Sequence, residues 1–293
     1  MTVCVAAMAN NGLIVCAADR MLTRGVTESE PDAAKIYNVT HGFPLTVMWA
    51  GSAAVFGEVI QDYFVHVKQT PEKYQSVGAC VDLYCKVFLA YLGNRAEREV
   101  LGRLGLTRRD LISNQVTDRR AGTLIDLVTS FDVPDEDYVE SIFAGHDASG
   151  SHIWRTLNAK SYCQDIEGVA VIGTGASLAL AQMQLMAHTP KADMLATIIG
   201  VYFAKRRAEG AVGVGKATDM CIRVDASPTA FEVPQTDLAA FGESYEDYAS
   251  NERQALANAI RSRTEMMMSA LKPREGSPLE SAPTPPSAST GGP

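Results

Sequence analysis

The order of elements along the chain predicts an α+β fold. Two observations carry this expectation: short β-branched-rich runs bounded by turn residues, and long segments whose apolar residues recur at helical spacing. The expected strands lie at 2–9, 13–18, 35–39, 45–49, 141–145, 152–157, 169–172 and 219–224. The expected helices lie at 53–68, 76–101, 176–187, 192–209 and 245–271, with one or two shorter ones within 105–140. The order is strands, helices, strands, helices and a last strand, before a helical extension.

Turn residues set the boundaries of these elements. Asn10-Asn11-Gly12 separates the first two apolar runs, and Asn-Gly is typical of tight β-hairpin turns. Gly- or Pro-containing turns at 41–44 and 147–150 join two further strand pairs. Gly51-Ser52 leads into the first long helix, and Gly173-Thr174-Gly175 separates a buried strand from the helix that follows it. The chain is therefore expected to open with a hairpin.

The chain is expected to divide into a main domain, an extension and a tail. The domain covers residues 1–226 and contains a helical insertion at 105–140, and a C-terminal helical extension covers 227–271. Residues 272–293 are rich in proline, serine and glycine and have few large apolar side chains. Such a segment cannot bury enough apolar surface to fold, so the tail is expected to be disordered.

Composition excludes several classes of protein. The chain has 293 residues, of which 46% are hydrophobic and 20% charged, which is enough to bury a large core. A formal net charge of −8 argues against nonspecific nucleic-acid binding, which needs clustered Lys and Arg. The longest apolar stretches are far shorter than the roughly 20 residues of a membrane helix. We expect no secretory signal, because the N-terminus has no basic region and Asn10 and Asn11 interrupt its apolar run. We expect no membrane association and a cytoplasmic location.

Cysteine and histidine spacing gives no sign of a metal centre or a cofactor. The six cysteines contain no C-x-x-C pair, so neither a zinc ribbon nor a redox motif is present in the sequence. His146, Asp147 and His152 lie across a glycine-containing turn without further convergent ligands. We therefore expect neither a bound metal nor a cofactor.

The second residue is a candidate nucleophile. Thr2 directly follows Met1, and methionine aminopeptidases generally remove Met before a residue this small. A threonine hydroxyl is a poor nucleophile alone, but at a chain start its own α-amine, with a reference pKa near 8, can act as general base. Threonine at position 2 is common, so the rest of the pattern must carry the interpretation.

The pattern after Thr2 resembles the proteasome β-subunit family and its bacterial relatives. It consists of T-V-C-V-A, a turn, L-I-V-C-A-A-D-R, an isolated A-K-I and then W-A-G-S-A-A. Asp19 and Lys35 are 16 positions apart, which agrees with the family, whereas Thr2 to Asp19 is one residue longer. The resemblance extends from residue 2 to about 226, weakly through 105–140. It implies an N-terminal-nucleophile hydrolase with a four-layer αββα sandwich, in which two antiparallel sheets are covered by helices.

The resemblance gives each matched residue a role. Lys35 would place positive charge beside Thr2 and lower the pKa of its hydroxyl or amine. Asp19 would fix and charge-balance that lysine. Gly51 would offer its backbone N–H to the oxyanion of a tetrahedral intermediate, where one such donor contributes about 3 to 4 kcal/mol. Without the family pattern, Lys35 and Asp19 are better explained as a plain surface ion pair.

Thr174 corresponds to a family serine whose hydroxyl helps to hold the free N-terminus. It lies in Gly173-Thr174-Gly175, between a strand and a helix. A dinucleotide-binding motif would need glycine at position 178, where the chain has Leu178.

The glycine-rich segment 210–216 departs from the family pattern. It nearly spells a phosphate-binding loop, but Ala217 replaces the required Ser or Thr, and a helix precedes where a strand should. In the family this region carries an Asp and, three residues later, a Ser near the threonine amine. The matching positions are Glu209 and Val212, so the carboxylate is kept and the serine is missing.

These residues favour a threonine endopeptidase-like amide hydrolase. The resemblance implies a peptide or protein substrate and a homo-oligomeric ring, and leaves a partner ATPase unidentified. Two alternatives stay open: an inactive proteasome-like scaffold subunit, favoured by Val212, and a small-molecule amidohydrolase, since fold alone does not set the substrate.

Overall fold

The structure is a computed structural model that describes residues 2–24, 27–29, 34–39, 43–112, 118–129, 131, 134, 137–225 and 227–271. The expected turn at 41–44 lies partly outside these residues, and the expected disordered tail at 272–293 lies wholly outside them. The chain forms two compact units, Met1–Glu243 and Ser244–Pro293. The first unit contains both main sheets and the candidate site.

Two five-stranded antiparallel sheets form the centre of the first unit. The first sheet has the order β10 (Val169–Ile172), β1 (Cys4–Met8), β2 (Ile14–Asp19), β11 (Thr218–Arg223), β12 (Phe231–Glu232). The second has the order β5 (Ile36–Val39), β6 (Leu45–Gly51), β7 (Val139–Asp147), β8 (Gly150–Leu157), β9 (Lys160–Cys163). A small separate hairpin pairs β3 (Leu22–Arg24) with β4 (Thr27–Ser29).

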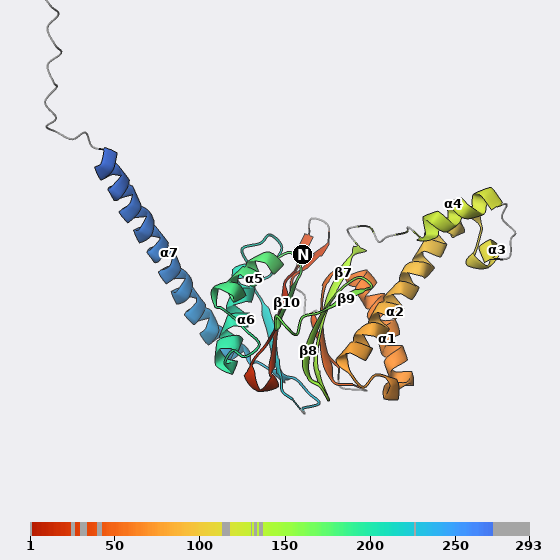
Figure 1. The fold of residues 1–293 in the computed structure, drawn as a ribbon, viewed down its shortest axis with the longest axis horizontal. Coiled ribbons are helices and arrows are strands. Elements are labelled where there is room, and N and C mark those ends of the chain that lie inside the picture. The colour runs from red at the N-terminus through yellow and green to blue at the C-terminus, as the bar shows by residue number, and fades with distance from the viewer. Residues whose placement is uncertain are drawn as a thin grey trace, which may run out of the picture. The chain divides into compact units, whose positions relative to one another are not determined.

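Helices cover both outer faces of the two sheets, as Figure 1 shows. The second sheet packs against α1 (Ala53–Gln69) and α2 (Val77–Ala96), and the first sheet packs against α5 (Ala176–Leu185) and α6 (Met194–Ala208). The remaining helices are α3 (Arg108–Ile112), α4 (Asp118–Thr129) and α7 (Gln235–Leu271). Short helical segments lie at Asn10–Gly12, Pro71–Lys73, Glu97–Leu101 and Gly102–Leu104. The expected four-layer αββα sandwich is confirmed.

Small and large apolar side chains together fill the layer between the two sheets. Ala6 and Ala18 from the first sheet pack in one buried cluster with Met48, Ile142 and Ala144 from the second. A second cluster, rich in aromatic residues, lies between the second sheet and its two helices. The residues of the candidate active site lie at the edge of this layer, beside the start of the chain.

The opening hairpin brings the start of the chain beside the end of β2. Asn11 (φ 59°) and Gly12 (φ 73°) adopt left-handed backbone conformations in the turn, which Asn and Gly tolerate best. The antiparallel register then places Cys4 opposite Ala18. One step further, the Asp19 N–H donates to the Val3 carbonyl at 3.2 Å. The hairpin therefore fixes the distance between residue 2 and residue 19.

Several elements differ from the sequence expectation. Strands β9 and β12 and the β3–β4 hairpin were not expected, and α7 begins at Gln235 rather than near residue 245. The first compact unit ends at Glu243, and within it β12 pairs with β11 and the Phe241 ring lies 5.7 Å from that of Tyr202 on α6. The domain boundary at residue 226 stays a prediction. Within the described part of the chain, the helices are too short or too polar to cross a membrane.

Candidate active site

Thr2, Asp19 and Lys35 converge in the structure. The Lys35 ammonium donates to Thr2 Oγ1, and the Thr2 hydroxyl donates to Asp19 Oδ1. Lys35 Nζ and Asp19 Oδ1 are 3.0 Å apart. Thr2, Asp19 and Lys35 are 3%, 0% and 1% exposed, so this is a buried cluster and not the surface ion pair that local sequence alone favours.

Asp19 accepts hydrogen bonds on both carboxylate oxygens. Oδ1 also receives the Val3 N–H at 2.9 Å, and Oδ2 receives the N–H groups of Met21 at 3.1 Å and Gly215 at 2.8 Å. A buried carboxylate is costly unless its lone pairs are used and a cation lies nearby. Both conditions are met here, so Asp19 is held in one orientation.

The Lys35 ammonium is also held in one position by its hydrogen bonds. Its ammonium has three N–H donors, and these reach Thr2 Oγ1, Asp19 Oδ1 and the Met21 carbonyl. The residue immediately precedes β5, so the strand pairing of the second sheet sets its position. The result is a fixed cation against a threonine hydroxyl at the start of the chain.

The Gly173–Gly175 turn holds the backbone of Thr2. The Gly175 N–H donates to the Thr2 carbonyl at 3.2 Å. Gly173 has φ +90°, and a Cβ there would lie 2.4 Å from the same carbonyl oxygen. The Gly173 N–H donates in turn to Glu140 Oε2 at 2.8 Å. Glycine is therefore required at position 173 both for its backbone angle and for the close approach of Thr2.

Thr174 and Gly51 occupy the expected junctions. Thr174 lies between the two glycines that contact Thr2, and it is exposed. Gly51 ends β6 opposite Val139 with φ +104°, just before the N-cap Ser52 of α1. The roles of the Thr174 hydroxyl and the Gly51 N–H stay predictions.

Glu209 contacts lysine and arginine rather than the threonine. Its carboxylate lies 2.7 Å from Lys205 Nζ and 3.4 Å from Arg206 Nε, both on α6. Among the described contacts none joins Glu209 to Thr2. Val212, which stands where the family has a serine, is 75% exposed. The role of Glu209 near the Thr2 amine, which the family pattern implies, stays a prediction.

Comparisons with known proteins place this arrangement in a known fold. No protein-family model and no curated protein matches the chain. Among solved structures, a Gly-1 mutant of Anbu from Hyphomicrobium sp. strain MC1 is 13% identical, with a TM-score of 0.61, over 88% of this chain and 99% of its own. Anbu, the ancestral beta-subunit, from Yersinia bercovieri is 12% identical, with a TM-score of 0.60, over 87% and 97%.

The fold is proteasome-like.

Three further residues lie near the site and were not predicted from the sequence. Gly215 donates to Asp19, fully buried Lys205 donates to the carbonyl of the next residue, Lys216, and Glu140 binds the turn that holds Thr2. The glycine density of 210–216 signals an irregular backbone, but not which side chain that backbone would contact. Nothing in the local sequence distinguishes Lys205 or Glu140 from surface charges.

Cys4 lies close to the cluster without competing with Thr2 as a nucleophile. Its Sγ donates to the Trp49 carbonyl at 3.3 Å. Burial raises the pKa of the Cys4 thiol well above its usual range, although the Lys35 charge opposes the effect. A protonated thiol is a weak nucleophile. Cys4 is therefore not expected to act as a nucleophile beside Thr2.

The histidines considered as metal ligands have other partners. His146 Nε2 contacts the Gly12 carbonyl. His152 lies between Asp165, at 2.7 Å from Nδ1, and Asp147, at 3.1 Å from Nε2. Over the residues that the structure describes, no group of three or more His, Cys, Asp or Glu side chains is placed to hold a metal ion.

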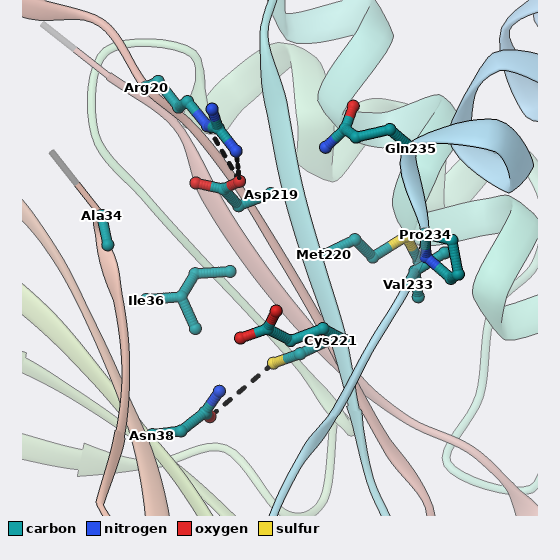
Figure 2. Close-up of a pocket in the computed structure, with 11 residues that line it drawn as sticks. Arg20, Ala34, Ile36, Asn38, Asp219, Met220, Cys221, Val233, Pro234 and Gln235 are labelled. Carbon is teal, nitrogen blue, oxygen red and sulfur yellow. Dashed lines mark hydrogen bonds and ion pairs between the residues drawn. The ribbon is translucent and has the colours of Figure 1, made fainter. Parts of the chain in front are cut away.

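A cavity of about 620 Å³ borders the strands that carry the cluster, and Figure 2 shows its lining. Arg20 and Ala34, the sequence neighbours of Asp19 and Lys35, line it, whereas Asp19 and Lys35 do not. Arg20 forms an ion pair with Asp219 across its wall. The cavity is therefore lined by sequence neighbours of the cluster residues, but the side chains of Asp19 and Lys35 do not face it.

Proposed function

We propose that this protein is a threonine-type N-terminal-nucleophile peptidase or amide hydrolase that uses Thr2 after removal of Met1. The main observation behind this proposal is that Lys35 and Asp19 both form hydrogen bonds with Thr2 Oγ1 and with each other. These residues are far apart in sequence. Pairing of β1 with β2 brings Asp19 to Thr2, and packing of the second sheet against the first brings Lys35 to both. A hydroxyl between a fixed cation and a carboxylate is well placed for nucleophilic attack.

The proposed reaction has two stages. In the first, the Thr2 hydroxyl attacks the substrate carbonyl while its proton passes to the free α-amine, and the amine then gives that proton to the leaving amine. An acyl ester on Thr2 remains. In the second, the α-amine takes a proton from water, the resulting hydroxide attacks the ester, and Thr2 regains its proton. The Gly51 N–H would stabilise the oxyanion in both stages.

Lys35 would act through its positive charge in both stages. Its hydrogen bond to Thr2 Oγ1 favours the alkoxide character that develops as the hydroxyl loses its proton. Asp19 would keep Lys35 in place and balance its charge.

The cost of the cluster supports catalysis over a purely structural role. Burying an ion pair costs several kcal/mol per ion before the pairing energy is recovered, and apolar replacements are often as stable. An inactive scaffold needs no such cluster beside Thr2. The presence of both charges against a threonine therefore favours the enzyme.

A scaffold subunit is the second candidate, and one observation favours it. The carboxylate of Glu209 pairs with Lys205, and exposed Val212 supplies no hydroxyl. The proton-relay groups of the family are thus not assembled beside Thr2 in the described contacts. For the enzyme, a peptide or protein substrate and a homo-oligomeric ring are proposed, with a small-molecule amide as the alternative substrate.

Hydrolysis of a panel of fluorogenic peptide amides and simple acyl amides tests the proposal. Thr2→Ala and Lys35→Ala should each lower the rate by at least about 100-fold, the lower range for loss of an acid–base partner, while Thr2→Ser keeps activity. Thr236→Ala and Lys86→Ala, both at exposed sites, are matched controls and should leave the rate unchanged. An unchanged rate in Lys35→Ala would overturn the enzyme reading in favour of the scaffold.

A further inference from the structure

Lys205 is a second buried lysine near the cluster. It lies on α6, is 0% exposed, and its Nζ donates to Glu209 Oε1 at 2.7 Å and to the Lys216 carbonyl at 2.7 Å. Lysine is almost never fully buried unless it is paired. The pairing with Glu209 accounts for the charge, but it does not explain why the ammonium also reaches a backbone carbonyl outside its helix.

That carbonyl belongs to the segment that contacts Asp19. Lys216 follows Gly215, whose N–H donates to Asp19 Oδ2 at 2.8 Å. The segment lies between the end of α6 at Ala208 and the start of β11 at Thr218, where neither helix nor strand hydrogen bonds fix the backbone. Lys205 therefore holds the stretch of chain that supplies a donor to the carboxylate.

Electrostatics link Lys205 to the same carboxylate. Burial lowers the pKa of Lys205, whereas the charge and hydrogen bond of Glu209 and the charge of Asp19 act in the opposite direction. The negative charge of Asp19 is thus felt by Lys205 as well as by Lys35.

We propose that Lys205 is a positioning residue for Asp19. By holding the Lys216 carbonyl, it keeps the Gly215 N–H on Asp19 Oδ2, which leaves Oδ1 directed at Thr2 and Lys35. The proposal rests on the function proposed above, since it assigns Lys205 to the same reaction. It predicts that losing the ammonium misplaces the nucleophile without altering how substrate binds.

Kinetics of Lys205→Met test this inference, since methionine keeps an unbranched chain that is only one atom shorter and removes the donors. The expected result is a kcat lower by about 10- to 100-fold, the range for a small misplacement of reacting groups, with KM unchanged. The control is Thr197→Val, which removes a buried hydroxyl that donates to the Asp193 carbonyl at 2.9 Å on the same helix. Thr197→Val should keep kcat even where it lowers the melting temperature equally.

The experiment distinguishes an incorrect role for Lys205 from an incorrect proposed function. If the wild type hydrolyses amides in a Thr2-dependent way and Lys205→Met has an unchanged kcat, the inference is wrong and the function stands. If the wild type has no such activity, the function is wrong. A crystal structure of Lys205→Met then decides the positioning role: separation of Gly215 N from Asp19 Oδ2 supports it, and a retained contact overturns it.

A second variant covers the case in which Lys205→Met does not fold. Gly215→Pro removes the amide hydrogen that Asp19 accepts without changing any side chain of α6. The same loss in kcat with unchanged KM is expected. An unchanged kcat in Gly215→Pro would show that the held backbone does not matter to Asp19, and would overturn the inference.

Discussion

At the scale of single residues, Asp19 and Lys35 depend on each other. Both side chains are almost completely buried, and each is the nearest opposite charge of the other in the cluster. A buried charge whose partner is removed must either be desolvated alone or lose its ionisation. Removing one partner should therefore lower the free energy of unfolding, and this effect can be measured separately from catalysis.

Asp19→Asn should destabilise the protein by roughly 3 to 5 kcal/mol, because it leaves the Lys35 ammonium buried without its counter-charge. The double variant Asp19→Asn/Lys35→Met removes both charges and should be more stable than Asp19→Asn alone. Chemical denaturation of the single and double variants measures the difference. A double variant that is less stable than either single one would contradict the interdependence.

Gly173→Ala should displace Thr2 and lower hydrolysis. The added Cβ would lie 2.4 Å from the Thr2 carbonyl oxygen, so the start of β1 has to move. Gly150→Ala is the matched control, because Gly150 has φ +125° but nothing within 4 Å of its added Cβ. Both variants should lose stability from backbone strain, and only Gly173→Ala should lose kcat. Equal losses of kcat in the two variants would contradict this account.

At the scale of elements, His152 on β8 links strand β7, the segment after β9 and, through Asp147, the start of α2. It lies between Asp165, which accepts the Ile153 N–H at 2.9 Å, and Asp147, which accepts the N–H of Val77 at the start of α2 at 3.2 Å. Burial lowers the pKa of His152, but the hydrogen bond and charge of Asp165 and the charge of Asp147 outweigh it, so the pKa is raised. The protonated imidazole therefore stabilises this junction.

The contribution of His152 to stability should fall as pH rises. Because its pKa is raised above the unfolded value of about 6.5, the contribution is fully present below that pH and is lost as pH rises through the folded pKa. The difference in melting temperature between wild type and His152→Gln should shrink from about pH 6.5 upward. In an Asp165→Asn background the pH dependence should be weaker. A difference that grows with pH would contradict the assignment.

The sequence predicted those elements whose signals are local. Asn10-Asn11-Gly12 predicted the opening hairpin, and the run at 169–172 with its following glycines predicted β10 and α5, because turn chemistry and apolar periodicity act over a few residues. Strand β12 has two exposed residues, and β9 has only one partner strand. Neither has an apolar alternation of its own, so only pairing with a neighbour makes it a strand.

The site was predictable only in part for the same reason. Thr2, Asp19 and Lys35 stand out through the family pattern, which encodes long-range pairing that no local rule contains. The donors that hold them, at Gly215 and on Lys205, come from α6 and the segment after it. Their role depends on how the first sheet packs against α6, which no local pattern encodes. The pairing of Glu209 with Lys205 is another contact that the sequence did not predict.

At the scale of the whole molecule, the outer helices carry exposed apolar side chains. Val65 on α1 is 47% exposed and Leu89 on α2 is 58% exposed. Exposed apolar side chains that gather on one layer indicate an association surface. Leu185 on α5 and Leu195 on α6 are also exposed, at 62% and 55%. We propose the helices that cover the second sheet as one contact between copies of the chain.

The protein should form a homo-oligomer at micromolar concentration. Val65→Glu/Leu89→Glu should lower the mass measured by light scattering, because two charges would be desolvated at the expected contact. The matched control is Leu256→Glu on α7, where leucine is 61% exposed outside the first unit, and it should leave the mass unchanged. A monomeric wild type would count against the ring.

The central claim is that Thr2 is the first residue of the mature chain and carries the acyl group. The most direct measurement is mass spectrometry of a hydrolytically active preparation, quenched with acid during turnover and mapped by peptides. The account predicts an N-terminal peptide that begins at Thr2, with the substrate's acyl group attached to it. An active preparation whose N-terminal peptide retains Met1, or whose acyl group lies on another residue, would contradict the account.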